Sequence, residues 1–388
     1  MFRLTRFLAE LIRPTPPRRP APTGPVVIWN LIRRCNLNCI HCYSLSADVD
    51  FPGELSTEEI FRVMEDLRAF GVPVLILSGG EPLLRPDIFT VSARAKERGF
   101  YLGLSTNGAL IDAPMADRIA AVGYDYVGVS LDGIGSVHDR FRRQEGAFDR
   151  SLAGIRLLRA RGIKVGLRFT LTERNVESFV PLLDLMEAEA IDKFYLSHLV
   201  YSGRSRRYRM DDAAHATTRA VMDELIERAW RHLREGRGSE FVTGNNDADG
   251  VYLLRWVERR FPEKAAHLRA HLEAWGGNAS GVNIANIDNL GNVHPDTFWW
   301  HHSLGNVRER PFSAIWQDLS DPILAGLRRR PRAISGRCGR CAEFAICGGN
   351  TRIRALRTYD DAFAEDPGCY LRDEELGLVT GESARAAA

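Results

Sequence analysis

The chain has 388 residues, of which 45% are hydrophobic and 26% are charged, and its formal net charge is +2. This is the composition of a globular protein of two to three domains. It excludes a disordered chain, a collagen-like repeat and a small disulfide-rich protein. The near-balance of charges creates no overall basic field, so we expect no nucleic-acid partner.

The seven cysteines are an odd number and fall into two groups, which indicates metal ligands rather than disulfides. No apolar run approaches the ~18 residues of a membrane span. Residues 2–12 are amphipathic and lack the apolar core of a signal peptide. We therefore expect a soluble, cytoplasmic enzyme.

The first part of the chain predicts a flexible segment followed by alternating strands and helices. Residues 13–25 are rich in proline and arginine, so residues 1–25 are predicted to be flexible. Apolar, β-branched runs predict strands at 26–32, 73–77, 100–104, 125–131, 164–171 and 194–199. Helical patterns lie between them at 57–70, 86–98, 112–122, 147–161 and 175–189. Ser56 and Glu59 form a capping box at the start of the first helix.

This alternation predicts an α/β fold with a parallel sheet, a partial (β/α)6 barrel over residues 26–205. An open doubly wound sheet is the alternative. Helical patterns at 213–235 and 250–274 predict a helical linker region over 206–275. Loops, a short hairpin and the second cysteine group predict a small C-terminal domain over 276–377, and residues 378–388 are predicted to be disordered.

The first cysteine group, Cys35, Cys39 and Cys42, follows the first predicted strand with the spacing C-x3-C-x2-C. Three thiolates leave one iron of a cubane cluster without a protein ligand, so that a small molecule can coordinate it. A zinc knuckle is the alternative, although structural zinc prefers four closed ligands. The group stands at the carboxyl end of a parallel strand, where α/β barrels build active sites.

Three further motifs follow successive strands: Ser78-Gly79-Gly80-Glu81-Pro82, Ser105-Thr106-Asn107-Gly108 and Ser130-Leu131-Asp132-Gly133. With the cysteine group, they resemble the radical S-adenosylmethionine (SAM) superfamily. The resemblance implies a [4Fe–4S] cluster and SAM, which yields a 5′-deoxyadenosyl radical that abstracts hydrogen from the substrate. No catalytic side chain is expected, because the cofactors carry the chemistry.

The resemblance also implies which residues bind SAM or cover the cluster. Only glycine lets the backbone approach a ligand closely, which explains the Gly-Gly pair. Either Arg143, in the stretch 138–143, or Arg168 is expected to bind the SAM carboxylate. The full set is Tyr43, Gly79, Gly80, Glu81, Thr106, Asn107, Ser130, Asp132, Arg143 and Arg168.

The second group, Cys338, Cys341, Cys347 and Cys369, has the spacing C-x2-C-x5-C-x21-C. Four cysteines complete a closed site for either zinc or [4Fe–4S]. The pattern resembles the SPASM domain that follows many radical SAM barrels, which implies an auxiliary [4Fe–4S] cluster. A SPASM domain holds two, but Asp296 and Thr351 stand where cysteines of the other are expected. Asp296 could be an unusual cluster ligand, but the sequence favours a solvated loop residue at this position. We therefore expect one auxiliary cluster and two [4Fe–4S] clusters in total.

The segments 195–207, 242–254, 286–300 and 347–377 resemble the tetrapyrrole-modifying branch, and most of all the radical SAM family of heme d1 biosynthesis. This resemblance implies modification of the propionate side chains of didecarboxysiroheme. It also implies a low-potential electron donor such as flavodoxin or ferredoxin. The alternatives are oxidative decarboxylation of iron-coproporphyrin by an alternative heme synthase, a peptide-modifying radical SAM/SPASM enzyme, and an iron–sulfur or zinc protein without enzymatic activity.

A macrocycle rimmed with carboxylates needs arginines, which bind carboxylates in bidentate fashion, and an iron tetrapyrrole also accepts an axial histidine. Arginines are concentrated in the loop after the sixth strand. The predicted substrate residues are His198, Arg204, Arg206 and Arg207. Trp299 and Trp300 are candidates to face the macrocycle, and further candidate iron ligands are His294, His301 and His302.

Overall fold

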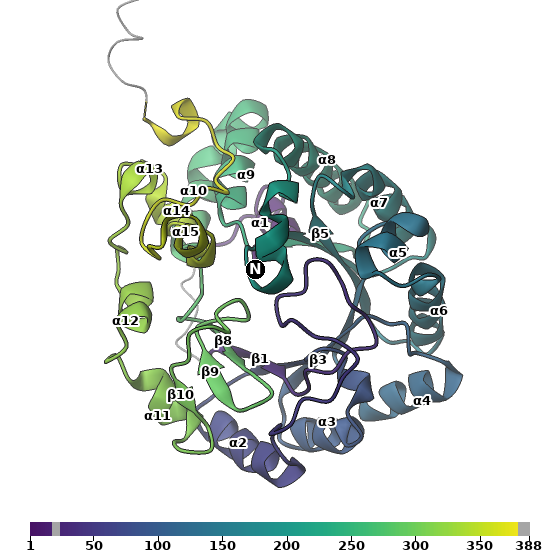
Figure 1. The fold of residues 1–388 in the computed structure, drawn as a ribbon. Coiled ribbons are helices and arrows are strands. Elements are labelled where there is room, and N and C mark those ends of the chain that lie inside the picture. Colours follow the sequence, from purple (N-terminus) through teal and green to yellow (C-terminus); the bar gives the residue numbers. More distant parts are fainter. Residues whose placement is uncertain (18–23, 379–388) are drawn as a thin grey trace, which may run out of the picture. The chain divides into compact units, whose positions relative to one another are not determined.

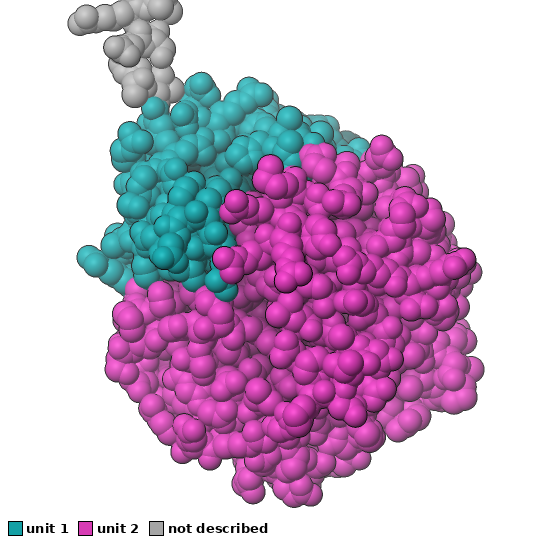
Figure 2. All heavy atoms as spheres, viewed as in Figure 1, with its two compact units in different colours: residues 1–20, 213–278, 329–388 teal, residues 21–212, 279–328 magenta. Residues whose placement is uncertain are grey.

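The computed structural model describes residues 1–17 and 24–378. Apart from residue 378, the predicted disordered tail lies outside the described residues. The chain divides into two compact units, coloured separately in Figure 2. We call residues 21–212 and 279–328 the barrel unit, and residues 1–20, 213–278 and 329–388 the helical unit.

The barrel unit begins with six parallel strands that pair in chain order, and this confirms the predicted (β/α)6 barrel. The strands are β1 (Val26–Asn30), β2 (Val74–Ser78), β3 (Tyr101–Thr106), β4 (Tyr126–Ser130), β5 (Val165–Leu171) and β6 (Lys193–His198). The helices between them are α2 (Thr57–Ala69), α3 (Ile88–Glu97), α4 (Ala113–Val122), α5 (Ser136–Arg142), α6 (Ala147–Ala160) and α7 (Phe179–Ala188). Short 3-10 turns lie at Pro82–Leu84, Val176–Ser178 and Gly203–Asp211.

Burial explains why these segments form a barrel. Side chains such as Val27, Leu75 and Leu104 are fully or almost fully buried, and the helices surround the outside of the sheet (Figure 1). The capping box predicted for α2 is present, because Glu59 N donates to Ser56 Oγ at 3.2 Å and Ser56 N donates to the Glu59 carboxylate at 2.8 Å.

Residues 279–328, which the sequence places in the C-terminal domain, belong to the barrel unit. Strand β8 (Ile284–Ile287) pairs in parallel with β1, and β9 (Asn292–His294) returns antiparallel to β8, forming the predicted hairpin. The order of strands in this unit is therefore β10-β9-β8-β1-β2-β3-β4-β5-β6. The remaining elements of the segment are β10 (Gly305–Asn306), α11 (Phe312–Gln317) and α12 (Pro322–Arg328).

The helical unit contains α8 (His215–Arg234), α9 (Ala248–Arg260) and α10 (Pro262–Trp275), with β7 (Glu240–Gly244) between the first two. The pattern predicted as one helix over 250–274 is two, because Pro262 disfavours a helical conformation at Phe261 and itself starts α10. The other helices are α1 (Leu4–Ala9), α13 (Gly336–Gly339), α14 (Phe344–Cys347), α15 (Arg352–Tyr359) and a 3-10 turn at Glu374–Leu376. No helix among the described residues is long and apolar enough to cross a membrane.

Candidate active site

The first three cysteines lie together in the loop that follows β1. Cys35 and Cys39 are buried, and Cys42 packs against them. Their sulfur atoms are surrounded by hydrogen-bond donors: Leu37 N lies 3.4 Å from Cys35 Sγ, and Arg142 Nη1 lies 3.4 Å from Cys39 Sγ. Burial raises the pKa of the Cys35 and Cys39 thiols. A bound metal lowers the pKa again, because it stabilises the thiolates. Three converging sulfurs with donors around them fit an iron–sulfur cluster.

Gly79 and Gly80 press against the backbone of the cysteine loop. Gly80 N donates to Ile32 O at 2.6 Å, and Glu81 N donates to Arg34 O at 2.9 Å. A Cβ at Gly79 would lie 2.3 Å from Ile32 O, and one at Gly80 would lie 2.2 Å from Arg34 O. The Gly-Gly pair is thus required for the close approach of two loops, whatever ligand it also meets.

Glu81 joins the loops after β2 and β3. Its buried carboxylate accepts hydrogen bonds from Thr106 Oγ1 at 2.7 Å, Asn107 N at 2.8 Å and Leu83 N at 3.1 Å. Burial raises its pKa to about 7, against the lowering effect of these donors. Asn107 also lies beside the cysteines, with Nδ2 at 3.9 Å from Cys35 Sγ. The Ser-Gly-Gly-Glu-Pro and Ser-Thr-Asn-Gly motifs therefore form one structure next to the first cysteine group.

Asp132 and Arg142 form a buried ion pair beside Cys39. Asp132 Oδ1 also accepts a hydrogen bond from Thr170 N at 2.7 Å. The neighbouring Arg143 adopts a positive φ of 56°, and its guanidinium donates to Tyr208 Oη at 2.8 Å instead. Of the two adjacent arginines, the structure thus brings Arg142 to the cysteines, whereas the sequence prediction named Arg143.

His41 is a second residue that the sequence analysis did not assign. Its side chain is half-buried, with 19% exposed, and Nε2 lies 3.8 Å from Asp132 Oδ2. Nδ1 has no hydrogen-bond partner among the described residues. Burial lowers the pKa of His41 to about 4, so the ring is neutral at pH 7. The signal in the sequence was its position between Cys39 and Cys42.

The other predicted SAM residues lie in the same unit, Ser130 and Arg168 on strands and Tyr43 in the loop after β1. Ser130 and Arg168 are register partners on β4 and β5, and the Arg168 guanidinium donates to Ser105 Oγ. The Tyr43 hydroxyl accepts from Asn30 Nδ2 at 2.9 Å. The Phe298 and Trp300 rings make T-shaped contacts with the Tyr43 ring, with centroid distances of 5.5 and 6.1 Å. Tyr43 is thereby fixed in the loop that carries the cysteines.

The predicted substrate arginines divide into two kinds. Arg204 turns back onto the cysteine loop, where Nε donates to Cys39 O at 2.7 Å and Nη1 donates to Ser46 O at 2.9 Å. Arg206 and Arg207 are exposed on the same 3-10 helix. His198, the last residue of β6, is buried. Arg204 therefore supports the cysteine loop, while Arg206 and Arg207 remain accessible to a carboxylate.

The aromatic and histidine candidates near β9 are mostly engaged within the protein. Trp299 is fully buried, and Trp300 is half-buried. His294 uses both ring nitrogens, toward His302 O at 2.7 Å and Asp288 Oδ2 at 3.3 Å. His302 Nε2 lies 2.9 Å from Asp321 Oδ2. These contacts leave His294 without a free nitrogen for iron.

The four C-terminal cysteines line a single pocket in the helical unit, together with Arg337, Asp366 and apolar side chains. Gly349 N donates to Cys347 Sγ at 3.3 Å. Burial raises the pKa of the Cys369 thiol to about 12. The four sulfurs form a closed donor set, suited to zinc or to an iron–sulfur cluster.

Segments distant in sequence hold this pocket in shape. Asn350 Oδ1 accepts from Ala248 N at 3.2 Å, and its Nδ2 donates to Asn246 Oδ1 at 2.7 Å. Asn246 Nδ2 in turn donates to Gly368 O at 2.8 Å. The stretches 242–254, 347–354 and 365–370, which carried much of the family resemblance, are therefore joined around the cysteines.

Two positions that hold cysteine in a complete SPASM domain have other roles here. Thr351 is buried at the start of α15. Asp296, which the sequence favours as a solvated loop residue, is buried; it accepts hydrogen bonds from Ser280 Oγ and, at 2.8 Å, from Phe298 N.

A buried ion pair fixes the segment that carries Cys369. Arg354 on α15 donates to both oxygens of Asp366 at 2.9 and 2.7 Å, and the two side chains are 1% and 0% exposed. Replacing Arg354 with methionine leaves the buried Asp366 carboxylate without its ion-pair partner. We therefore expect a loss of about 3–5 kcal/mol in the free energy of unfolding. Urea denaturation measures this loss, and the exposed Thr358→Ala on the same helix is the control. Adding Asp366→Asn should recover part of the loss; no recovery would contradict the ion-pair explanation.

The fold and the three-cysteine loop define a partial (β/α)6 barrel with an iron–sulfur site at the carboxyl ends of its strands. The chain belongs to the radical SAM superfamily, whose family model matches residues 29–186. A [4Fe–4S] cluster and SAM are the cofactors of this superfamily, and the residues around Cys35, Cys39 and Cys42 fit the cluster.

Relatives and solved structures agree with this assignment. The chain is 57% identical to the Pre-heme d1 synthase of Dinoroseobacter shibae, over 98% of this chain and 95% of the relative. It is 45% identical to the Fe-coproporphyrin III synthase of Methanosarcina barkeri, over 91% and 89% of the two chains. The crystal structure of Streptococcus suis SuiB bound to S-adenosylmethionine shares the fold. Its TM-score is 0.71 at 18% identity, covering 90% of this chain and 78% of that one.

Proposed function

We propose that this radical SAM enzyme modifies the propionate side chains of didecarboxysiroheme on the way to heme d1. The identity of 57% to a Pre-heme d1 synthase, which extends over both cysteine groups, carries the proposal. When bound, the first cluster and SAM supply a 5′-deoxyadenosyl radical that removes a hydrogen atom from the substrate.

The protein's own part in this reaction is to hold the cofactors and exclude water. Cys35, Cys39 and Cys42 provide the cluster ligands, and donors from Leu37 N and Arg142 stabilise the charge on the sulfurs. Glu81 keeps the two glycine-containing loops together beside them. Gly79, Gly80, Thr106, Asn107, Ser130, Asp132 and Arg168 are the proposed SAM contacts, with Arg142 preferred over Arg143 because it lies at the cysteines.

We also assign an auxiliary [4Fe–4S] cluster to Cys338, Cys341, Cys347 and Cys369. The pocket they share and the Gly349 N donor to Cys347 Sγ support this assignment. Burial raises the pKa of the Cys338 thiol, and the charge of the fully buried Arg352 opposes this rise. A cationic side chain at this place favours a cluster with a net negative charge. The electron donor for the first cluster is proposed to be a flavodoxin or a ferredoxin.

Substrate recognition is proposed to rest on carboxylate contacts from Arg206 and Arg207, which are exposed on the loop after β6. Arg pairs with carboxylates through two parallel hydrogen bonds. His198 is the candidate for contact with the macrocycle or its iron, because it is the last residue of β6, the strand that leads into the loop with Arg206 and Arg207. Arg204 contributes indirectly, through its hydrogen bonds to the cysteine loop.

The decisive experiment is product analysis by mass spectrometry under anaerobic conditions. Didecarboxysiroheme is expected to lose mass from its propionates only when SAM and reductant are both present, with formation of 5′-deoxyadenosine. The similarity to an Fe-coproporphyrin III synthase supports a second candidate, in which the product is Fe-coproporphyrin III. Conversion of iron-coproporphyrin to heme, with didecarboxysiroheme ignored, would refute both. Absence of any tetrapyrrole binding in visible titrations would refute the substrate class.

A further inference from the structure

The N-terminal segment, predicted to be flexible, is bound to the helical unit over its first 17 residues. Phe2 exchanges two backbone hydrogen bonds of 2.8 Å with Thr243 of β7. The Phe2 ring stacks on Phe7 at 4.9 Å, and both contact Trp275 at the end of α10. Thr15 N donates to the Glu10 carboxylate at 2.8 Å. This docking brings Glu10, just after α1, against α10.

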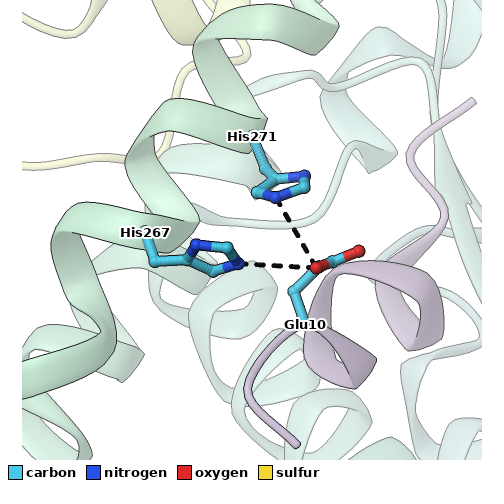
Figure 3. Close-up of side chains that lie close together, drawn as sticks. All are labelled: Glu10, His267 and His271. Carbon is cyan, nitrogen blue, oxygen red and sulfur yellow. Dashed lines mark hydrogen bonds and ion pairs between the residues drawn. The ribbon is translucent and has the colours of Figure 1, made fainter. Parts of the chain in front are cut away.

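Three potential metal ligands meet at this place. His267 and His271 lie four residues apart on α10, so their rings project from the same helix face, with centroids 4.6 Å apart. Both rings point at the Glu10 carboxylate (Figure 3). His267 Nε2 and His271 Nε2 lie 3.4 and 3.5 Å from Glu10 Oε2, and the ligand atoms of the group all lie within 4.8 Å of one another.

These separations match those between neighbouring ligands of a tetrahedral metal ion. With metal–ligand distances of about 2.0–2.1 Å, adjacent ligands of a tetrahedron lie roughly 3.4 Å apart. The carbonyl oxygen of Thr15, at 2.7 Å from His271 Nε2, stands next to the group as a further oxygen. The side chains of Glu10 and His271 are 12% exposed and that of His267 is 30% exposed, so the site is shielded but open to entry from solvent.

We propose that Glu10, His267 and His271 bind a divalent transition-metal ion, Zn²⁺ in the first instance, which fastens the N-terminal segment to α10. Two imidazoles and one carboxylate are a donor set that Zn²⁺ accepts, and the group contains none of the thiolates that an iron–sulfur cluster needs. Binding requires neutral imidazoles with a free Nε2 lone pair, so the proton that His271 Nε2 donates to Thr15 O is lost to solvent as the metal enters, and Nδ1 takes up a proton from solvent to keep the ring neutral. The proposal is independent of the tetrapyrrole substrate.

The test measures zinc in the holoenzyme. Protein with reconstituted clusters is incubated with ZnCl₂, desalted and analysed for zinc and iron by mass spectrometry. The wild type is expected to retain about one zinc per chain without losing iron, because this site uses no cysteine. His267→Gln/His271→Gln should retain none. His215→Gln, which changes an exposed histidine on α8 of the same unit, is the matched control and should bind zinc like the wild type.

A second readout distinguishes a metal site from a simple ion pair. Zinc should raise the melting temperature of the wild type, because it binds the folded state, and should slow proteolysis within residues 1–17. Glu10→Gln removes the anionic ligand but keeps the side-chain size, and should abolish both zinc effects. If His267→Gln/His271→Gln fails to fold, as judged from its iron content, Glu10→Gln alone tests whether the three residues bind zinc. Retention of zinc by either variant, or no zinc in the wild type, overturns the proposal.

Discussion

Replacing Cys35, Cys39 and Cys42 together with alanine is expected to abolish SAM cleavage and to leave about four iron atoms per chain instead of about eight. The three sulfurs converge in the loop after β1, whereas the other four cysteines line a separate pocket in the helical unit. Because all seven cysteines are divided between these two sites, removing one set should spare the other. Iron and sulfide determination, together with a 5′-deoxyadenosine assay, measures both effects.

The matched control is Cys338→Ala/Cys341→Ala, which alters the second pocket only. This variant is expected to keep the first cluster and to cleave SAM in the absence of substrate. About twelve irons in the wild type would contradict the assignment. Stoichiometric zinc that is removed by the Cys338→Ala/Cys341→Ala change would contradict the auxiliary cluster, while leaving the first site intact.

The arginines of the loop after β6 are expected to have two different functions, substrate binding and support of the cysteine loop. Arg206→Gln/Arg207→Gln should lower didecarboxysiroheme turnover by roughly 10- to 100-fold, since a misplaced substrate loses the alignment needed for hydrogen abstraction. SAM cleavage without substrate should be nearly unchanged, because both side chains are exposed to solvent.

Arg204→Gln should behave differently. Its guanidinium donates to Cys39 O and Ser46 O, and Nη2 is buried without a hydrogen-bond partner among the described residues. Losing these contacts loosens the cysteine loop, so iron content, SAM cleavage and turnover should fall together. Arg150→Gln, an exposed arginine on the outer helix α6, is the control. If Arg204→Gln and Arg206→Gln/Arg207→Gln changed SAM cleavage equally, the assignment of different functions to these arginines would be wrong.

The barrel and the two cysteine sites could be predicted from local sequence. Runs such as Val165–Leu171 are apolar on both faces, and only a parallel sheet covered by helices buries such strands. Cysteine spacing marks metal ligands directly, because coordination geometry demands them close together. The superfamily followed from motifs that stand at the ends of successive strands.

Side-chain direction was decided by the tertiary structure. Arg142 and Arg143 are adjacent, yet the left-handed turn at Arg143, with φ 56°, sends one guanidinium to Cys39 and the other to Tyr208. Arg204 and Arg206 are two residues apart on one turn, yet Arg204 donates to the cysteine loop whereas Arg206 is exposed to solvent. Sequence spacing fixes neither outcome, because each depends on which long-range partner is within reach.

Long-range pairing also set the unit boundaries. The segment 279–328 joins the barrel because β8 pairs with β1, a contact between residues more than 250 positions apart. The N-terminal residues pack against the rest of the helical unit because Phe2 pairs with the backbone of Thr243 and contacts the Trp275 ring. Composition predicted a flexible segment, since proline and arginine dominate residues 13–20. Local patterns thus determined which strands, helices and cysteine sites form, and tertiary packing determined what each side chain touches, because burial and hydrogen bonding are satisfied by partners distant in the chain.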